Sequence, residues 1–192
     1  LLIDPTSSYA QAAAMAMGRA MDDVIISAAL GTAFTGETGS TSTANANSIA
    51  HGSAGLTIAK LRTAKQTLDL GDVDPSIPRH IIVSPKQITD LLGTTEVTSS
   101  DFNTVKALAN GEINSFLGFN FIVSNRLSLS GSTRSCIAYA QDGIALAVGK
   151  DVQARIDERA DKSYATQVYY CMSIGATRME EAKVVEVQAT ES

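Results

Sequence analysis

Residues 4–31, DPTSSYAQAAAMAMGRAMDDVIISAALG, predict one long helix around which the rest of the chain is organised. The opening Asp-Pro-Thr supplies two N-cap residue types and a proline suited to the first helical position, and Gly31 is a typical helix stop. Almost every residue between them is a good or tolerable helix former. We therefore expect a helix over residues 5–30, a rod about 38 Å long at about 1.5 Å per residue.

The surface of this helix is thin and carries few charges. Alanine recurs along its whole length, and charge is confined to Arg19, Asp22 and Asp23. A solvated helix normally carries charge along one face, so we expect this helix to be covered on most sides by the rest of the chain or by other copies of it. Neighbouring helical residues point about 100° apart, so the two aspartates do not form a catalytic dyad. Solvation or pairing with Arg19 is the simpler interpretation.

The composition predicts a globular, soluble chain that does not bind nucleic acid as its main function. The 192 residues carry a net charge of −5, and 44% are hydrophobic, which is enough apolar sequence for a substantial core. An acidic chain without a long Lys/Arg cluster is poorly suited to tracking phosphates. The sequence has no signal peptide and no apolar run long enough to span a membrane.

The cysteines and the first residues allow two further expectations. Cys136 and Cys171 lie inside the apolar runs SCIAYA and YYCMSIG, which predicts buried free thiols in a reducing compartment and no disulfide or metal framework. The chain begins at Leu1, without Met, in the apolar tripeptide LLI. We interpret this start as the ordered or excised part of a longer protein.

The remaining pattern predicts an α+β fold with helices and strands in mixed order. Residues 32–55 are mostly Gly, Ser, Thr, Ala and Asn, which predicts a long flexible loop. Residues 135–149 indicate two strands around a tight Asp142-Gly143 turn. Ser84 is expected to cap a helix that starts at Pro85 and stops at Gly93. Further helices are expected at residues 56–70, an amphipathic segment, and 101–110, and further strands at residues 79–84, 118–124, 166–175 and 183–188.

No segment carries a motif that predicts catalysis or cofactor binding. GIALAVGK at residues 143–150 has five residues between its glycines where a P-loop has four, and Asp follows its lysine, so it is not a P-loop. His51 and His80 have no Cys, His or acidic residue at ligand spacing, so no metal site is expected. Ser53 does not lie in a nucleophile motif. We therefore expect no enzyme activity, no metal and no cofactor.

Four stretches, in this order, resemble the major capsid proteins of tailed bacteriophages of the Hong Kong 97 type. The long-helix segment, with its exit at GTAFTGE, resembles the spine helix of that family. HIIVSPKQITDLLG resembles its strand leading into a short helix, and LGFNFIVSNRL its glycine-led axial strand. RIDERADKSYATQVYYCMSIGATRMEEAKVVEV resembles the charged return segment and the final strands of the peripheral domain.

The resemblance covers essentially the whole chain and implies a flat subunit with two lobes. The peripheral domain would hold residues 1–55, with the spine helix at 5–30, and the return strands of residues 152–192. The axial domain would hold residues 56–151. Family members also carry an N-terminal arm and an extended loop before the spine helix, and neither has a counterpart in this sequence. Some members cross-link through a lysine of that loop, so no such chemistry is carried over.

The function implied by the resemblance is that of a structural protein. Copies of the chain would assemble as pentamers and hexamers into the icosahedral shell of a phage head, which encloses double-stranded DNA without sequence-specific binding. Scaffolding and portal proteins would be further partners, and no membrane would be involved. The protein would be made in the cytoplasm of the bacterial host and end in the virion.

Charged residues are the candidates for contacts between subunits. The mixed-sign run at residues 155–162 and the segment 178–181 predict such contacts, together with the charged residues of the long helix. Two alternatives stay open. A nanocompartment (encapsulin-like) shell protein would share the fold, and a small α+β enzyme with an unrecognised site would show a concave pocket lined by convergent polar groups. The candidate contact residues are Arg19, Asp22, Asp23, Arg155, Asp157, Arg159, Arg178 and Glu180.

Overall fold

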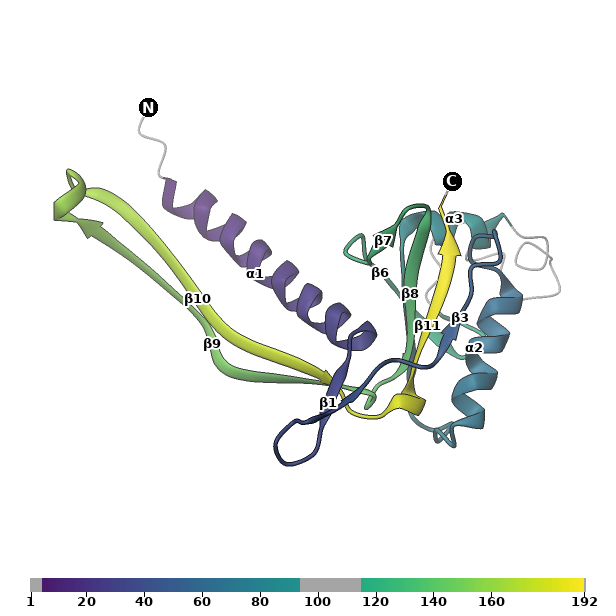
Figure 1. Ribbon diagram of the computed structural model, residues 1–192. Helices are drawn as coiled ribbons and strands as arrows, with labels where there is room; N and C mark the ends of the chain where they lie inside the picture. The colour runs from purple at the N-terminus through teal and green to yellow at the C-terminus, as the bar shows by residue number, and fades with distance from the viewer. Residues whose placement is uncertain (1–4, 94–114, 192) are drawn as a thin grey trace.

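The computed structural model describes residues 5–93 and 115–191, with side chains from residue 8 onward. Within this part the chain forms an α+β fold: one long helix, two shorter helices, a large mixed sheet and a separate long β-hairpin (Figure 1). The helix expected at residues 101–110 lies outside the described residues.

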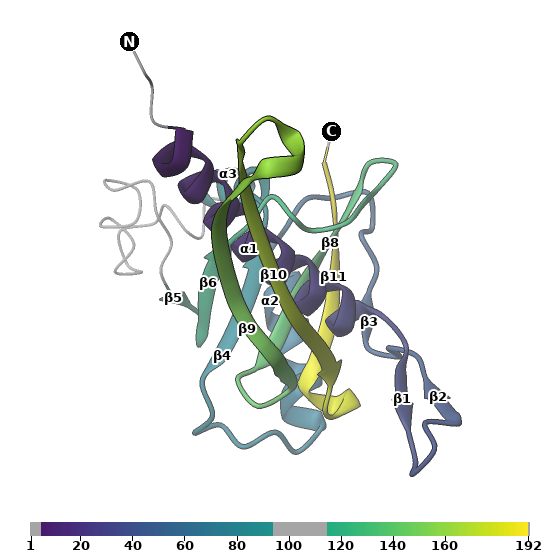
Figure 2. The ribbon, with the colours of Figure 1, turned by 90° about the vertical axis from the view of Figure 1, so that its left-hand side faces the viewer.

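Helix α1 (Pro5–Leu30) confirms the long helix predicted from the sequence. It ends as expected at Gly31, whose backbone N–H donates to the carbonyl oxygen of Ser27 at 2.8 Å. A Cβ atom at Gly31 would lie only 2.6 Å from that oxygen, so a larger residue would disturb this turn. The helix projects away from the large sheet and runs beside the long hairpin (Figures 1 and 2).

The large sheet follows the strand order β3–β11–β8–β4–β6–β5, and β7 pairs with β8. Strands β4 and β6 are parallel, as are β11 and β3, whereas β8 is antiparallel to both β4 and β11. The strand that comes last in the sequence, β11, therefore lies between β3 and β8. The strand bounds are β3 (Ser48–Ile49), β4 (Arg79–Val83), β5 (Ser115–Phe116), β6 (Phe119–Val123), β7 (Leu129–Ser130), β8 (Thr133–Ala140) and β11 (Val184–Thr190).

Helices on the two faces of this sheet enclose the core. Helix α2 (Ile58–Leu70) covers one face, and the C-terminal end of α1 approaches the opposite face (Figures 1 and 2). The predicted amphipathic pattern of α2 is confirmed, because Leu61, Ala64 and Leu68 are its buried residues. Helix α3 (Pro85–Leu92) follows β4 and buries Gln87, Ile88 and Leu91. The large side chains at the centre of the core include Leu56, Ile81, Phe119, Ile137 and Val185.

The long hairpin consists of β9 (Ile144–Arg159) and β10 (Ala165–Arg178), with a short 3-10 turn, η1 (Ala160–Lys162), at its tip. Each of the two strands pairs only with the other among the strands of the described part. The register shifts on both sides of Ser173, so β9 carries two bulges there. Bulges bend a β-ribbon, and the hairpin curves beside α1 (Figure 1).

The structure corrects the expectation of an unstructured loop at residues 32–55. This segment forms a small hairpin, β1 (Ala33–Thr35) with β2 (Thr41–Thr43), and then supplies β3 to the large sheet. The partner of β3 is β11, so the pairing joins segments far apart in the sequence. Composition alone does not reveal a strand whose partner is so distant.

Two local expectations are confirmed in position, but the residues involved make other contacts than their local pattern suggests. Strands are present on both sides of the Asp142-Gly143 turn, but they do not form a hairpin, because β8 belongs to the large sheet and β9 pairs with β10. Ser84 does occupy the N-cap position of α3, yet its side chain makes no cap hydrogen bond. Its hydroxyl donates to the carboxylate of Glu191 instead.

Candidate assembly surfaces

Helix α1 is covered by its own chain on one side. Its partly buried side chains recur at helical spacing, as at Ala13, Met17 and Val24, and the helix contacts chiefly β10. Among its described side chains only Ile26 and Ala29, near the C-terminal end, are buried. Tyr9 is 63% exposed and Met15 65% exposed. The predicted cover on most sides of the helix is therefore not supplied within a single chain.

The β9–β10 hairpin presents a polar face away from α1. Residues Arg155 and Asp157 of β9 stand opposite Tyr169 and Gln167 of β10 and line a shallow hollow of about 350 Å³. Neither charged residue forms an ion pair with any residue in the described part of the chain. This polar face, which also includes Lys150, Gln153 and Cys171, is free for contacts with another molecule.

The opposite face of the hairpin is apolar. Side chains alternate along a strand, so Val168, Tyr170 and Ile174 share the face of β10 from which Arg178 reaches the end of α1. Ile156, across from Val168, is still 46% exposed. The apolar face is therefore only partly covered where α1 and the hairpin lie side by side.

The charged residues of α1 are placed differently from one another. Arg19 and Asp22 are exposed. Pairing with Arg19 is one of the two expectations for Asp23, but the structure does not show it. Asp23 forms a bidentate ion pair with Arg126, a residue between β6 and β7, and Arg126 Nε donates to Asp23 Oδ1 at 2.7 Å. The hydrogen bond from Arg126 lowers the pKa of Asp23. This ion pair links the long helix to the large sheet.

The remaining candidates lie at the two ends of the hairpin. At the tip, Arg159 Nε donates to Asp161 Oδ1 at 2.8 Å, and both side chains are about half exposed. At the base, Glu180 is exposed and pairs with Lys183 at 2.9 Å. Both groups are accessible for contacts with another copy.

Arg178 is the exception, because its side chain is buried within its own chain. Its guanidinium donates to the carbonyl oxygens of Ala29 at 3.0 Å, Gly31 at 2.8 Å and Thr43 at 3.0 Å, and pairs with the carboxylate of Glu181 at 3.0 Å. From the sequence, only the pairing of Arg178 with Glu181, three residues later, could be expected. Nothing in the sequence indicates its partner Gly31, 147 residues earlier.

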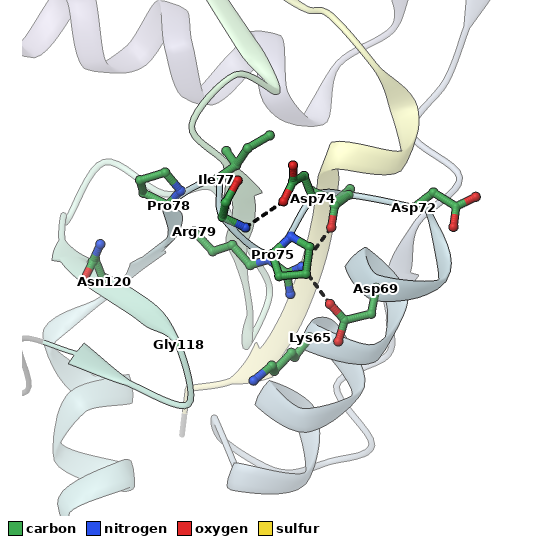
Figure 3. A pocket seen from close by; sticks show the side chains of 12 residues that line it. Lys65, Asp69, Asp72, Asp74, Pro75, Ile77, Pro78, Arg79, Gly118 and Asn120 are labelled. Carbon is green, nitrogen blue, oxygen red and sulfur yellow. Dashed lines mark hydrogen bonds and ion pairs between the residues drawn. The ribbon is translucent and has the colours of Figure 1, made fainter.

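A hollow that can be compared with an enzyme site lies beside the C-terminal half of α2 (Figure 3). It measures about 570 Å³, and three of its five charged side chains bind one another or the surrounding loop. Arg79 donates to Asp69 at 2.6 Å and to the carbonyl oxygen of Val73 at 3.2 Å, and Asp74 accepts the backbone N–H of Ser76 at 2.8 Å. Ser76 lies beside Asp74 in this lining, and the hydrogen bonds between the two residues close the turn of the loop, so the pair has a structural explanation.

Two further observations concern titratable groups elsewhere. Glu191 accepts hydrogen bonds from Arg134, Ser84 and Gln87, and these, with Arg134 first, lower the pKa of its carboxyl to about 2. Burial raises the pKa of the Cys136 thiol to about 12, so this cysteine is the expected inert, buried thiol. Cys171 is also a free thiol, but it is only partly buried, on the polar face of the hairpin.

Two kinds of feature are not found in the described part of the chain. No group of three or more His, Cys, Asp or Glu side chains in residues 5–93 and 115–191 is arranged to hold a metal ion. No helix in the same residues combines the length and the apolar character needed to cross a membrane.

Comparison with known proteins identifies the family. The model of the family described as "Phage capsid protein" matches residues 1–191. Comparison with curated protein sequences gives no match.

Solved structures of phage particles share the fold. A chain of Mycobacterium phage Che8 is 18% identical, with a TM-score of 0.74, and the match covers 93% of this chain and 61% of that one. The capsid of cyanophage P-SCSP1u is 17% identical with a TM-score of 0.72, covering 100% of this chain and 68% of that one. The head of Helicobacter pylori bacteriophage KHP40 is 14% identical with a TM-score of 0.70, covering 99% and 70%.

These matches agree with the extended surfaces of α1 and the hairpin described above. The chain spans 61% of the length of the Che8 chain. Because the family match runs over residues 1–191, the chain belongs to the phage capsid protein family, whose members are structural proteins of the virion head and not enzymes.

Proposed function

We propose that the chain forms the body of a major capsid protein of the Hong Kong 97 type, which assembles through pentamers and hexamers into an icosahedral head shell. The observation that carries the proposal is the long, largely uncovered helix α1 beside an extended hairpin in a chain of the capsid family. Capsid shells are built from many copies of one chain, and exposed apolar side chains such as Tyr9 and Met15 would be buried between copies.

The proposed subunit has the two lobes implied by the sequence. Residues 1–55 and 152–192 would form the peripheral lobe, built on α1 and the hairpin, and residues 56–151 the axial lobe, built on α2 and most of the large sheet. Strand β11 hydrogen-bonds to β8, so the end of the second peripheral segment is shared with the axial sheet.

The proposed contacts between subunits lie on both elements of the peripheral lobe. On the hairpin, the proposed contacts are accessible and lie far from the large sheet: they are Arg155 and Asp157 on the polar face and Arg159 at the tip. The other exposed candidates are Arg19, Asp22 and Glu180. Asp23 and Arg178 have partners within the chain, so we assign them to holding the subunit together.

The proposed partners follow from a shell around DNA. The net charge of −5 suits a container that does not hold its cargo tightly, so we propose that the DNA is enclosed without sequence-specific binding. Scaffolding and portal proteins would assist assembly in the cytoplasm of the bacterial host. The phage capsid family match favours a phage head over a nanocompartment shell of the same fold.

Electron microscopy of the full-length protein, expressed with and without its scaffolding protein, tests the proposal. We expect closed icosahedral particles. Purified protein that stays monomeric in both preparations, although folded by circular dichroism, would contradict it. A preparation in which shells form but co-purify with a packaged enzyme would instead indicate the nanocompartment function.

A further inference from the structure

The chain passes three times between the α1–hairpin lobe and the large sheet. The crossings are residues 31–47, which lead from α1 to β3, residues 141–143, which lead from β8 to β9, and residues 179–183, which lead from β10 to β11. We call these three segments, together with Arg178, the junction. Any change in the angle between the two lobes has to be absorbed here.

Arg178 and Glu181 bind the first and third crossings to each other. Arg178 donates to the carbonyl oxygens of Gly31 and Thr43, as described above. The carboxylate of Glu181 accepts the backbone N–H of Ala46 at 2.6 Å, and the carbonyl oxygen of Glu181 accepts the side-chain amide of Asn47 at 2.8 Å. These contacts fix the path of the chain from the end of α1 to the start of β3.

The second crossing joins the same cluster through the backbone. The N–H of Met179, next to Arg178, donates to the carbonyl oxygen of Gly143 at 2.9 Å. Lys183 adds an ion pair with Asp142 at 2.6 Å, but that aspartate is 46% exposed. The buried arginine therefore lies at the point where all three crossings meet.

The charge of Arg178 suits this position. Its side chain is 1% exposed and is neutralised by Glu181, and the carbonyl oxygens at the end of α1 carry the negative pole of the helix dipole. A guanidinium offers five donors in one rigid plane, so it holds its several acceptors in a fixed relative geometry. A lysine ammonium has neither the reach nor the plane to do so.

Packing between α1 and the large sheet is looser than this cluster. A hollow of about 190 Å³ lies on one side of Ile26, between α1 and β6, and another of about 390 Å³ lies on its other side, next to Arg126. The Asp23–Arg126 ion pair that spans this region is exposed, and exposed pairs add little rigidity. The junction therefore adds a directional constraint to the apolar contact that Ile26 and Ala29 make with the core.

We propose that Arg178, held by Glu181, sets the angle between the α1–hairpin lobe and the large sheet and thereby the curvature at which subunits close into a shell. The inference rests on the proposed function. In a shell of repeated contacts, a small change in subunit shape is repeated at every copy, so it alters the radius at which the assembly closes. Arg178 is thus a positioning residue for assembly, and it acts through its contacts within its own chain.

The test compares Arg178→Lys and Glu181→Asp with Asp142→Asn in the full-length protein, by particle diameters in electron microscopy. The first two keep every charge and change only geometry, and the third removes the exposed ion pair at the same junction. We expect Asp142→Asn to give particles of native diameter. Arg178→Lys and Glu181→Asp should shift the mean diameter or add a second population, open sheets included, with faster amide hydrogen exchange at residues 43–47.

Three outcomes would overturn the inference. Native diameters from both variants would show that the cluster does not set the angle. Folded variants that stay monomeric would place Arg178 in the contact itself, and loss of folding in both would make the cluster a requirement for folding alone. Absence of shells from the unsubstituted protein would instead count against the proposed function.

Discussion

At the scale of single residues, the carboxylate of Glu191 joins several elements around the end of the large sheet by hydrogen bonds. Arg134 donates to it from β8 at 2.7 Å, and Gln87 of α3 donates at 3.3 Å while its own amide oxygen accepts the backbone N–H of Leu56 at 2.8 Å. Ser84, at the start of α3, completes the set. The carboxylate therefore ties α3 and the segment before α2 to the strands β8 and β11.

We expect Glu191→Gln to lower the free energy of unfolding by about 2 kcal/mol at pH 7, a typical value for hydrogen bonds to a charged group. The folded-state pKa of about 2 lies below the ordinary value of 4.5. The stabilisation is therefore fully present above about pH 4.5 and is lost as the pH falls toward 2. Urea unfolding from pH 7 to pH 3 measures it.

The matched control is Glu180→Gln, which changes the same residue type at a site 55% exposed. The difference in stability between the unsubstituted protein and Glu191→Gln should shrink as the pH falls, while the control changes little at any pH. An acid-independent difference would show that the carboxylate charge is not what stabilises this site.

At the scale of helices and strands, the sequence predicts the elements whose signals are local. The helix at 5–30, the amphipathic helix before residue 71 and the strand beginning at Arg79 all carry caps or periodicity within their own segments, and the structure confirms them. The strand β3 and the sheet membership of β8 and β9 could not be predicted. Each is decided by hydrogen bonds to strands elsewhere in the chain.

The same limit applies to the candidate surfaces. The hairpin charges could be located from the mixed-sign run at residues 155–162, because a run is visible in the sequence. The pairing of Asp23 with Arg126 could not be predicted, because the two residues are 103 positions apart. The nearer Arg19 was the wrong partner. The burial of Arg178 depends on carbonyl oxygens of distant turns, which no residue type reveals.

The buried face of α2 supplies a test of the core. Leu61→Ala removes a side chain that is fully buried, and we expect it to lower the free energy of unfolding by about 2–5 kcal/mol. Leu70→Ala, at the exposed end of the same helix, is the control, since Leu70 is 76% exposed. Equal effects in chemical denaturation would contradict the assignment of the core-facing side.

The polar face of the hairpin supplies a test of the proposed contacts. Arg155→Glu should reduce the yield of closed shells by about tenfold, which corresponds to only about 1.4 kcal/mol of lost contact energy. The melting temperature of the isolated subunit should stay unchanged, because Arg155 is exposed and has no ion-pair partner in the described part of the chain. Arg62→Glu, on the exposed side of α2, controls for the charge change itself. Normal yields from Arg155→Glu would remove Arg155 from the proposed contacts.

At the scale of the whole molecule, the two thiols report which surfaces assembly covers. In the folded subunit we expect a thiol reagent to modify Cys171 and to leave the fully buried Cys136 unmodified. In closed shells the rate at Cys171 should fall at least several-fold, because the polar face of the hairpin would be shielded. Mass spectrometry of the modified protein distinguishes the two sites.

A Cys171→Ser variant provides the baseline for this measurement, since its native subunit should not react at all. Equal rates at Cys171 in subunits and in shells would place the polar face of the hairpin on an open surface of the particle. The proposed contacts would then have to lie on α1 or at the hairpin tip.

The position of β11 has a consequence for how the subunit is synthesised. This strand comes after every other strand in the sequence but lies inside the large sheet, and it joins residues as distant as Ser48 and Glu186, 138 positions apart. Until the ribosome has translated and released residues 184–190, β3 has no neighbour and β8 has a bare edge. Contacts of such long range also slow folding, because a long loop has to close before they form. A nascent chain that still holds these residues inside the ribosome therefore cannot complete the large sheet, so we expect the sheet to form only after synthesis has passed residue 190.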